Sequence, residues 1–182
     1  IIGMSRDKLT SALIDIEPKP KSIKMRESQI WNWIYQKGVT SFDFMTNISK
    51  EYRKNLKETF TIDRLTVTKK QISNDGTRKY LIRLPDGNTI EAVYIPEKNR
   101  GTLCISSQVG CTLNCSFCFT GTQKLVRNLT PAEIIGQILI VRDDLNEWPG
   151  KNMQREIKRQ ISNIVMMGMG EPLYNYDSVR DA

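Results

Sequence analysis

Histidine is absent from all 182 residues, and cysteine is scarce, with four copies. Structural zinc sites normally take four nitrogen or sulfur ligands, so a zinc site in this chain would have to use cysteine alone. Three of the cysteines, Cys111, Cys115 and Cys118, fall within eight residues, and only Cys104 lies elsewhere. A framework of structural disulfides is therefore a poor explanation for them.

Long apolar runs are also missing. Apolar residues make up 39% of the sequence, which is ordinary for a protein with a hydrophobic core, if slightly lean. No stretch approaches the about 20 apolar residues that a membrane-spanning helix needs. No secretion signal opens the chain. We therefore expect a protein without a membrane segment, in the cytoplasm, with reduced cysteines.

Positive charge is in excess, with a formal net charge of +7. The whole excess lies in residues 1–100, because residues 101–182 carry equal numbers of basic and acidic side chains. Nucleic-acid binding depends on such a basic surface, since the phosphates are negatively charged. A positive net charge also serves solubility alone. Charge by itself therefore leaves RNA binding and simple solubility open.

The three clustered cysteines have the spacing C-x3-C-x2-C. Cysteine thiolates in a short loop are the usual ligands of iron–sulfur clusters. Three such ligands on a four-iron cluster leave one iron open, and an open coordination position allows chemistry. Cys104 is available as a fourth ligand, but the resulting C-x6-C-x3-C-x2-C array is not a familiar zinc arrangement.

This motif, with the aromatic Phe117 just before the third cysteine, resembles that of the radical S-adenosylmethionine enzymes. Three longer segments are similar to one group within that superfamily, the RNA adenine-C2 methyltransferases: Thr102–Cys111, Arg127–Leu129 and Met166–Leu173. The resemblance implies a [4Fe-4S] cluster on Cys111, Cys115 and Cys118 and S-adenosylmethionine as the second cofactor. Electron transfer to the cofactor then yields a 5′-deoxyadenosyl radical.

The resemblance also implies the substrates and the reaction. These enzymes methylate C2 of an adenosine in 23S ribosomal RNA and, in many bacteria, of one in tRNA, through a methylcysteine intermediate. We accordingly expect an electron donor such as flavodoxin, a monomeric protein and a disulfide that forms during turnover. Adenine C2 is unactivated, so the cofactor supplies the difficult chemistry and the protein supplies placement.

Two catalytic residues follow from the resemblance. Glu91 lies twenty residues before Cys111 and matches the proton acceptor at the target adenine. A strand period of two puts its carboxylate on the face of Val93 and Ile95. Position alone would favour an ordinary solvent-facing glutamate. Cys104 lies seven residues before Cys111 and matches the cysteine that resolves a covalent RNA adduct by forming a disulfide with the methyl-carrying cysteine; position alone would favour a small core residue.

The segment Gly168–Pro172 follows a predicted buried strand. Its two glycines would allow the backbone to approach a ligand closely. Enzymes of the resembling superfamily hold the amino group of the cofactor with this segment, so Gly170 and Glu171 are the predicted cofactor-binding residues.

The first part of the chain is predicted to form two units. Residues 1–60 have helical periodicity over 4–16, over 28–37 and from Ser49 onward, and form a predicted helical accessory domain that contacts RNA by resemblance. Residues 61–97 contain alternating strands separated by turns at Asn74–Gly76 and Pro85–Gly87, which predicts a three-stranded meander.

Residues 98–182 are predicted to begin a parallel α/β barrel, with buried strands at 101–109 and 161–167. A capping box at Thr130 starts a helix that reaches about residue 146, and a polar inserted loop covers 147–160. The fold class is thus α/β, the first part of a partial (β/α)6 radical S-adenosylmethionine barrel. We expect a truncated enzyme, because the resembling enzymes continue to a methyl-carrying cysteine near their C-terminus. Cluster assembly would then be partial and methyl transfer absent.

Three other functions remain open. A closely related group of enzymes methylates C8 of the same adenosine. The sequence Gln108-Val109-Gly110 and the Met166–Leu173 segment favour methylation at C2. A radical enzyme with a small-molecule substrate is disfavoured by the basic first 100 residues. A non-catalytic RNA-binding module with zinc or an iron–sulfur cluster would use the same cysteines.

Overall fold

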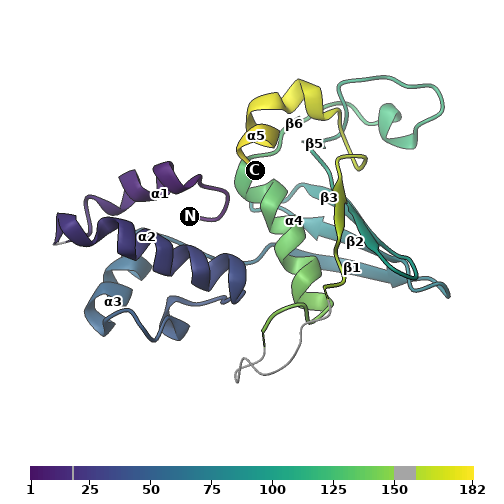
Figure 1. The fold of residues 1–182 in the computed structure, drawn as a ribbon. Helices are drawn as coiled ribbons and strands as arrows, with labels where there is room; N and C mark the ends of the chain where they lie inside the picture. The colour runs from purple at the N-terminus through teal and green to yellow at the C-terminus, as the bar shows by residue number, and fades with distance from the viewer. Residues whose placement is uncertain (18, 150–158) are drawn as a thin grey trace.

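The structure, a computed structural model, describes residues 1–17, 19–149 and 159–182. A helical body built from the first 60 residues lies beside a mixed α/β body (Figure 1). Each body has its own cluster of buried apolar side chains. In these described ranges, no helix combines the length and the apolar character needed to cross a membrane.

Three α-helices and short helical turns form the helical body: α1 (Arg6–Leu13), η1 (Pro20–Ser22), α2 (Ile23–Trp31), η2 (Asn32–Gln36), η3 (Phe42–Phe44) and α3 (Lys50–Thr59). Ser49 caps α3 as predicted, because its hydroxyl accepts a hydrogen bond from the backbone N–H of Tyr52. The second helix begins at Ile23 rather than at residue 28. Pro20 occupies the first turn of the preceding η1, where a missing N–H costs no hydrogen bond, so the helical stretch starts there.

A five-stranded sheet has the order β1-β2-β3-β4-β7. Its strands are β1 (Thr66–Ile72), β2 (Arg78–Arg83), β3 (Thr89–Pro96), β4 (Gly101–Cys104) and β7 (Asn163–Val165). Strands β1, β2 and β3 pair antiparallel in the order predicted for the three-stranded meander, β4 continues the sheet as a fourth antiparallel strand, and β4 pairs with β7 in parallel. The meander and the following α/β segment therefore share one continuous sheet.

Helix α4 (Pro131–Asp144) connects the parallel pair and covers one face of the sheet (Figure 1). Thr130 and Glu133 form the predicted capping box. After β7 the chain forms η5 (Pro172–Asn175) and α5 (Tyr176–Asp181). Of the predicted inserted loop, residues 150–158 lie outside the described residues.

Polar contacts join the helical body to the α/β body. The guanidinium of Arg64 lies 2.8 Å from a carboxylate oxygen of Asp143 and donates to the carbonyl of Gly38 at 3.0 Å. The ammonium of Lys8 lies 2.6 Å from the carboxylate of Asp181. These contacts hold the helical body against α4 and α5.

Candidate metal centre and cofactor site

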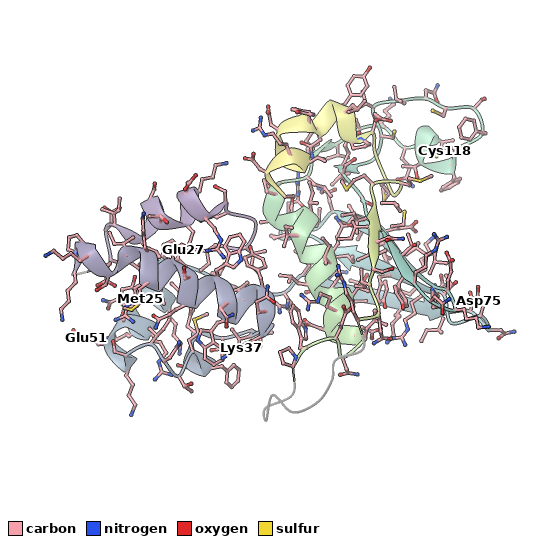
Figure 2. All side chains as sticks on the ribbon, viewed as in Figure 1. Met25, Glu27, Lys37, Glu51, Asp75 and Cys118 are labelled. Carbon is pink, nitrogen blue, oxygen red and sulfur yellow. The ribbon has the colours of Figure 1, made fainter. Side chains whose placement is uncertain are left out.

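The cysteine loop follows β5 (Gln108–Val109), and β6 (Arg127–Asn128) closes it by antiparallel pairing. The loop, which contains η4 (Phe119–Thr122), projects beyond the sheet on the side away from the helical body; Figure 2 labels Cys118 in it. Gly110 turns the chain into the loop with a φ of +76°, and a side chain there would overlap the carbonyl oxygen of Lys124. Only glycine adopts this conformation without strain.

Three free, half-buried thiols lie in this loop, on Cys111, Cys115 and Cys118. The N–H of Cys118 donates to the carbonyl of Cys115 at 3.1 Å, which closes a tight turn between the two. Backbone N–H groups of Gly121 and Thr120 lower the pKa of the Cys118 thiol. Thiolates are the metal-binding form of cysteine, so the donor set suits an iron–sulfur cluster.

The three sulfurs are not gathered into a finished metal site. In the part of the chain that the structure describes, no three Cys, Asp or Glu side chains come together closely enough to hold a metal ion. The loop therefore supplies suitable ligands on one short segment, and their assignment to a cluster stays a prediction.

The Gly168–Pro172 segment lies against the end of β4. The backbone N–H groups of Ser107 and Gln108 both donate to the carbonyl of Met169, at 2.9 and 3.2 Å. The N–H of Gly168 donates to the carbonyl of Ile105 at 3.0 Å. Because β4 and β7 are parallel neighbours, the segments that follow them emerge at the same edge of the sheet. Two motifs that are distant in sequence thus come together.

The two glycines of this segment have close neighbours in their own chain. A Cβ atom at Gly168 would lie 2.7 Å from the carbonyl carbon and oxygen of Ile105, and one at Gly170 would overlap the side chain of Gln108. The backbone N–H of Glu171 donates to Gln108 Oε1 at 3.0 Å, and the Glu171 carboxylate accepts from the N–H of Leu173 at 3.3 Å. Packing between protein segments is thus sufficient reason for both glycines, whatever ligand the segment binds.

Glu91 lies on β3 with its carboxylate 2.8 Å from the ammonium of Lys79, and the glutamate side chain is 41% exposed. It therefore has an ionic partner on the neighbouring strand rather than an apolar enclosure. The carbonyl of Glu91 accepts a 2.6 Å hydrogen bond from the hydroxyl of Ser106, which itself accepts from the N–H of Met169 at 2.9 Å. Ser106 thus connects the strand of Glu91 to the Gly168–Pro172 segment.

Cys104 is a free, half-buried thiol on β4, between Val93 of β3 and Val165 of β7. Burial raises the pKa of this thiol, and a hydrogen bond from the backbone of Met167 opposes the shift only in part. Protonated thiols are poor nucleophiles, so this environment lowers the reactivity of the Cys104 thiol. No disulfide is present among the described residues, where all four cysteines are free.

Sequence reasoning missed a group of buried polar side chains around the end of β4. They are Ser106, Ser107, Gln108, Gln137 and Asn175. Polar residue types are usually exposed, so a pattern of apolar positions could not have found them. One signal in the sequence could have indicated part of this group. Three of its members, Ser106, Ser107 and Gln108, directly precede the cysteine motif.

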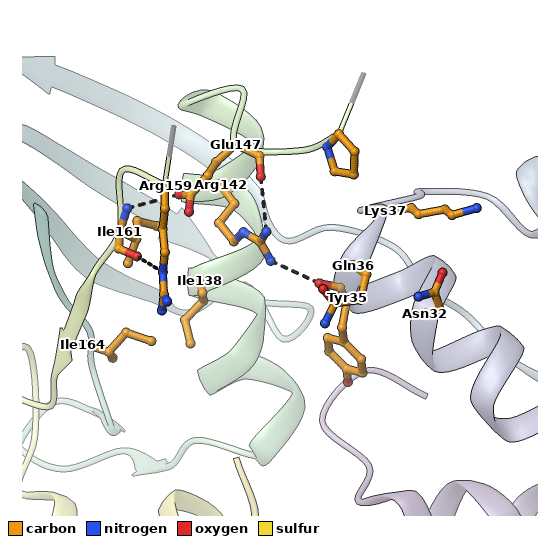
Figure 3. A pocket seen from close by; sticks show the side chains of 11 residues that line it. Asn32, Tyr35, Gln36, Lys37, Ile138, Arg142, Glu147, Arg159, Ile161 and Ile164 are labelled. Carbon is orange, nitrogen blue, oxygen red and sulfur yellow. Dashed lines mark hydrogen bonds between the residues drawn. The ribbon is translucent and has the colours of Figure 1, made fainter. Parts of the chain in front are cut away.

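A cavity of about 600 Å³ lies between η2 and α4, as Figure 3 shows. Arg142 extends across it and donates to the carbonyl oxygens of Tyr35 and Glu147, each at 3.2 Å. The Arg142 guanidinium also rests 3.6 Å from the centroid of the Trp148 ring. None of the predicted site residues lines this cavity, so it is separate from the cysteine loop.

The fold has a solved counterpart among the radical S-adenosylmethionine methyltransferases. A crystal structure titled as a radical SAM methyltransferase from Sphaerobacter thermophilus superposes with a TM-score of 0.83 at 35% sequence identity. The match covers 98% of this chain and 49% of that chain. The mixed α/β fold is therefore that of this class of enzyme.

Sequence relatives narrow the similarity further. Proteins named dual-specificity RNA methyltransferase RlmN from Ruegeria sp. (strain TM1040) and Jannaschia sp. (strain CCS1) are each 61% identical over the whole chain. A family model described as the ribosomal RNA large subunit methyltransferase N-terminal domain matches residues 1–62. The resemblance predicted from the motifs is confirmed. The chain spans about half the length of these curated relatives, 46% and 47%.

Proposed function

We propose that this chain forms part of a radical S-adenosylmethionine enzyme that methylates C2 of an adenosine in 23S ribosomal RNA and in tRNA. In this proposal residues 1–60 are an accessory RNA-contacting domain, residues 61–97 a linking meander, and residues 98–182 the first part of a partial (β/α)6 barrel. The whole-chain identity to RNA methyltransferases supports the reaction class.

One structural relationship carries the proposal. The cysteine loop follows β4 and β5, the Gly168–Pro172 segment follows β7, and the carbonyl of Met169 accepts backbone hydrogen bonds from Ser107 and Gln108 at the base of the loop. Ligands of α/β enzymes bind at this edge of a parallel sheet. A cofactor held by the segment would therefore lie next to a metal group held by the loop.

In this proposal the residues have the roles that the family resemblance implies. Cys111, Cys115 and Cys118 hold the [4Fe-4S] cluster, and Gly170 and Glu171 bind the amino group of S-adenosylmethionine. When bound, these two cofactors supply the one-electron chemistry that an unactivated adenine carbon requires.

Two further residues act on the RNA in this proposal. Glu91 accepts the proton from adenine C2, and Lys79 keeps its carboxylate in place through the 2.8 Å ion pair. Cys104 would release the product by attacking the sulfur of the methyl-carrying cysteine: a disulfide forms as the bond from that sulfur to the transferred carbon breaks, and the carbon keeps the bonding electrons and takes up a proton. Burial raises the pKa of the Cys104 thiol, so its protonated form is favoured.

The partners follow from charge and from the named relatives. The net positive charge lies in residues 1–100, which suits binding to the phosphates of 23S rRNA and tRNA. An electron donor such as flavodoxin, a monomeric state and a cytoplasmic location complete the proposal.

The test uses an extended enzyme, in which the remainder of the Ruegeria sp. relative is joined after Ala182. After anaerobic reconstitution, we expect it to release 5′-deoxyadenosine and to methylate 23S rRNA, with Cys115→Ala inactive as the control. Mapping the methyl group to C2 supports the proposal, and a methyl at C8 favours the related C8 enzymes. Absence of cofactor cleavage with a correctly folded protein would contradict it.

A further inference from the structure

Gln108 is fully buried, with 0% of its surface exposed, and both ends of its carboxamide are hydrogen-bonded. Its Oε1 accepts from the backbone N–H of Glu171 at 3.0 Å and from that of Thr112 at 3.3 Å. Its Nε2 donates to Asn128 Oδ1 at 2.7 Å and to the hydroxyl oxygen of Thr112 at 2.9 Å. A buried amide with partners on both ends is fixed in one orientation.

The three partners belong to three different segments. Thr112 directly follows Cys111 at the start of the cysteine loop, and Asn128 lies on β6, which closes the base of that loop. Glu171 belongs to the segment proposed to bind the cofactor. One side chain therefore links the candidate metal ligands to the candidate cofactor site.

Gly170 provides a second, independent observation. Its φ is +92°, and a Cβ atom there would lie 2.6 Å from Cγ of Gln108. The Gly168–Pro172 segment can approach the glutamine this closely only because position 170 has no side chain. The backbone at Gly170 is thus shaped around the methylenes of the Gln108 side chain.

We propose that Gln108 is a positioning residue. Its hydrogen bonds fix the position of the cysteine loop relative to the Gly168–Pro172 segment. The inference rests on the proposed function of those two motifs. Cysteines that would hold a cluster and a segment that would bind a second cofactor beside it need positions fixed to about 0.5 Å relative to one another. Supporting hydrogen bonds from buried side chains supply that precision, and a displacement of about 1 Å can cost about 100-fold.

A purely structural role is the competing explanation, and Gln137 is the matched control for it. Gln137 is also 0% exposed, and its carboxamide bonds the N–H and carbonyl of Ser106 at 2.8 and 2.9 Å. It contacts neither Thr112 nor Glu171 in the hydrogen bonds of the described residues. Loss of either glutamine should reduce the stability of the fold. Only loss of Gln108 should change the position of the cysteine loop relative to the Gly168–Pro172 segment.

The experiment compares Gln108→Met, Gln108→Glu and Gln137→Met in the extended enzyme. Electron paramagnetic resonance of the reduced cluster during titration with S-adenosylmethionine gives the Kd. We expect Gln108→Met to keep the iron content and raise the Kd by about tenfold to 100-fold. Gln108→Glu keeps an acceptor for the N–H groups of Thr112 and Glu171 but removes the donor to Asn128 Oδ1 and buries a charge, so its Kd should rise as well. Gln137→Met should lower the thermal midpoint with a Kd close to that of the parent.

Amide hydrogen exchange at Thr112 and Glu171, measured without cluster or cofactor, tests the contacts themselves. We expect both amides to be protected in the parent and in Gln137→Met and to exchange faster in Gln108→Met. Unchanged protection and affinity in Gln108→Met would overturn the inference, as would an equal rise in Kd for Gln137→Met. If the parent binds no cluster, the proposed function fails, and the exchange rates still decide whether Gln108 holds the two segments.

Discussion

A side chain at position 170 would collide with Gln108, because a Cβ atom added to Gly170 would overlap Cβ of the glutamine and lie 2.6 Å from its Cγ. The backbone at Gly170 also has a positive φ of +92°. Two separate constraints, one conformational and one steric, therefore require glycine at a position that the sequence suggested for ligand binding.

Gly170→Ala should lower the free energy of unfolding by about 2–4 kcal/mol, since backbone strain and steric overlap add. Gly87→Ala is the matched control, because Gly87 has a φ of +86° with nothing within 4 Å of its added Cβ. That control should lose only about 1–2 kcal/mol, from backbone strain alone. Urea denaturation of both variants measures the difference, and equal losses would show that the contact with Gln108 is unimportant.

Arg127→Gln should make stability less sensitive to acid. Arg127 lies 2.7–2.9 Å from both carboxylate oxygens of Glu133. Burial raises the pKa of Glu133, but the hydrogen bonds from Arg127 and Thr130 outweigh it, so the net shift is downward. A carboxyl group with a lowered folded-state pKa stabilises the fold above its unfolded pKa, about 4.3, and this contribution is lost as the pH falls further.

Denaturation at neutral pH and at about pH 3 tests this prediction. At neutral pH the variant should be less stable by about 2–4 kcal/mol, because a buried carboxylate loses its partner. The deficit should shrink as the pH falls, because protonation of Glu133 removes the charge that Arg127 stabilises. Lys54→Gln is the control, since its 3.8 Å pair with Glu58 is exposed and should matter by less than about 0.5 kcal/mol. A deficit that stays constant with pH would argue against the ion pair.

Glu91→Gln should slow turnover of the extended enzyme by at least about 100-fold, because the amide cannot accept the adenine proton. Blocked proton removal should also leave RNA covalently attached to the protein, which denaturing gel electrophoresis detects. Glu97→Gln is the control, since Glu97 is an exposed partner of Arg100 at 2.7 Å. Normal methylation by Glu91→Gln would remove this residue from the mechanism.

Local chemistry made much of the fold predictable. The turns at Gly76 and Gly87 and the capping box of Thr130 and Glu133 involve residues close in sequence, so their patterns identify them. The cysteine motif was likewise recognisable from spacing. The contact of Gln108 with Glu171 joins residues 63 positions apart, and no local pattern encodes it. The pairing of Glu91 with Lys79 depends on strand register, which a single sequence specifies only weakly.

Iron content after anaerobic reconstitution tests the central claim most directly, with Cys115→Ala and Cys104→Ala measured beside the parent extended enzyme. We predict about four irons per chain and a brown colour for the parent and for Cys104→Ala, with both lost in Cys115→Ala. A colourless protein that binds zinc through Cys104, Cys111, Cys115 and Cys118, and loses it in Cys104→Ala, would contradict the account.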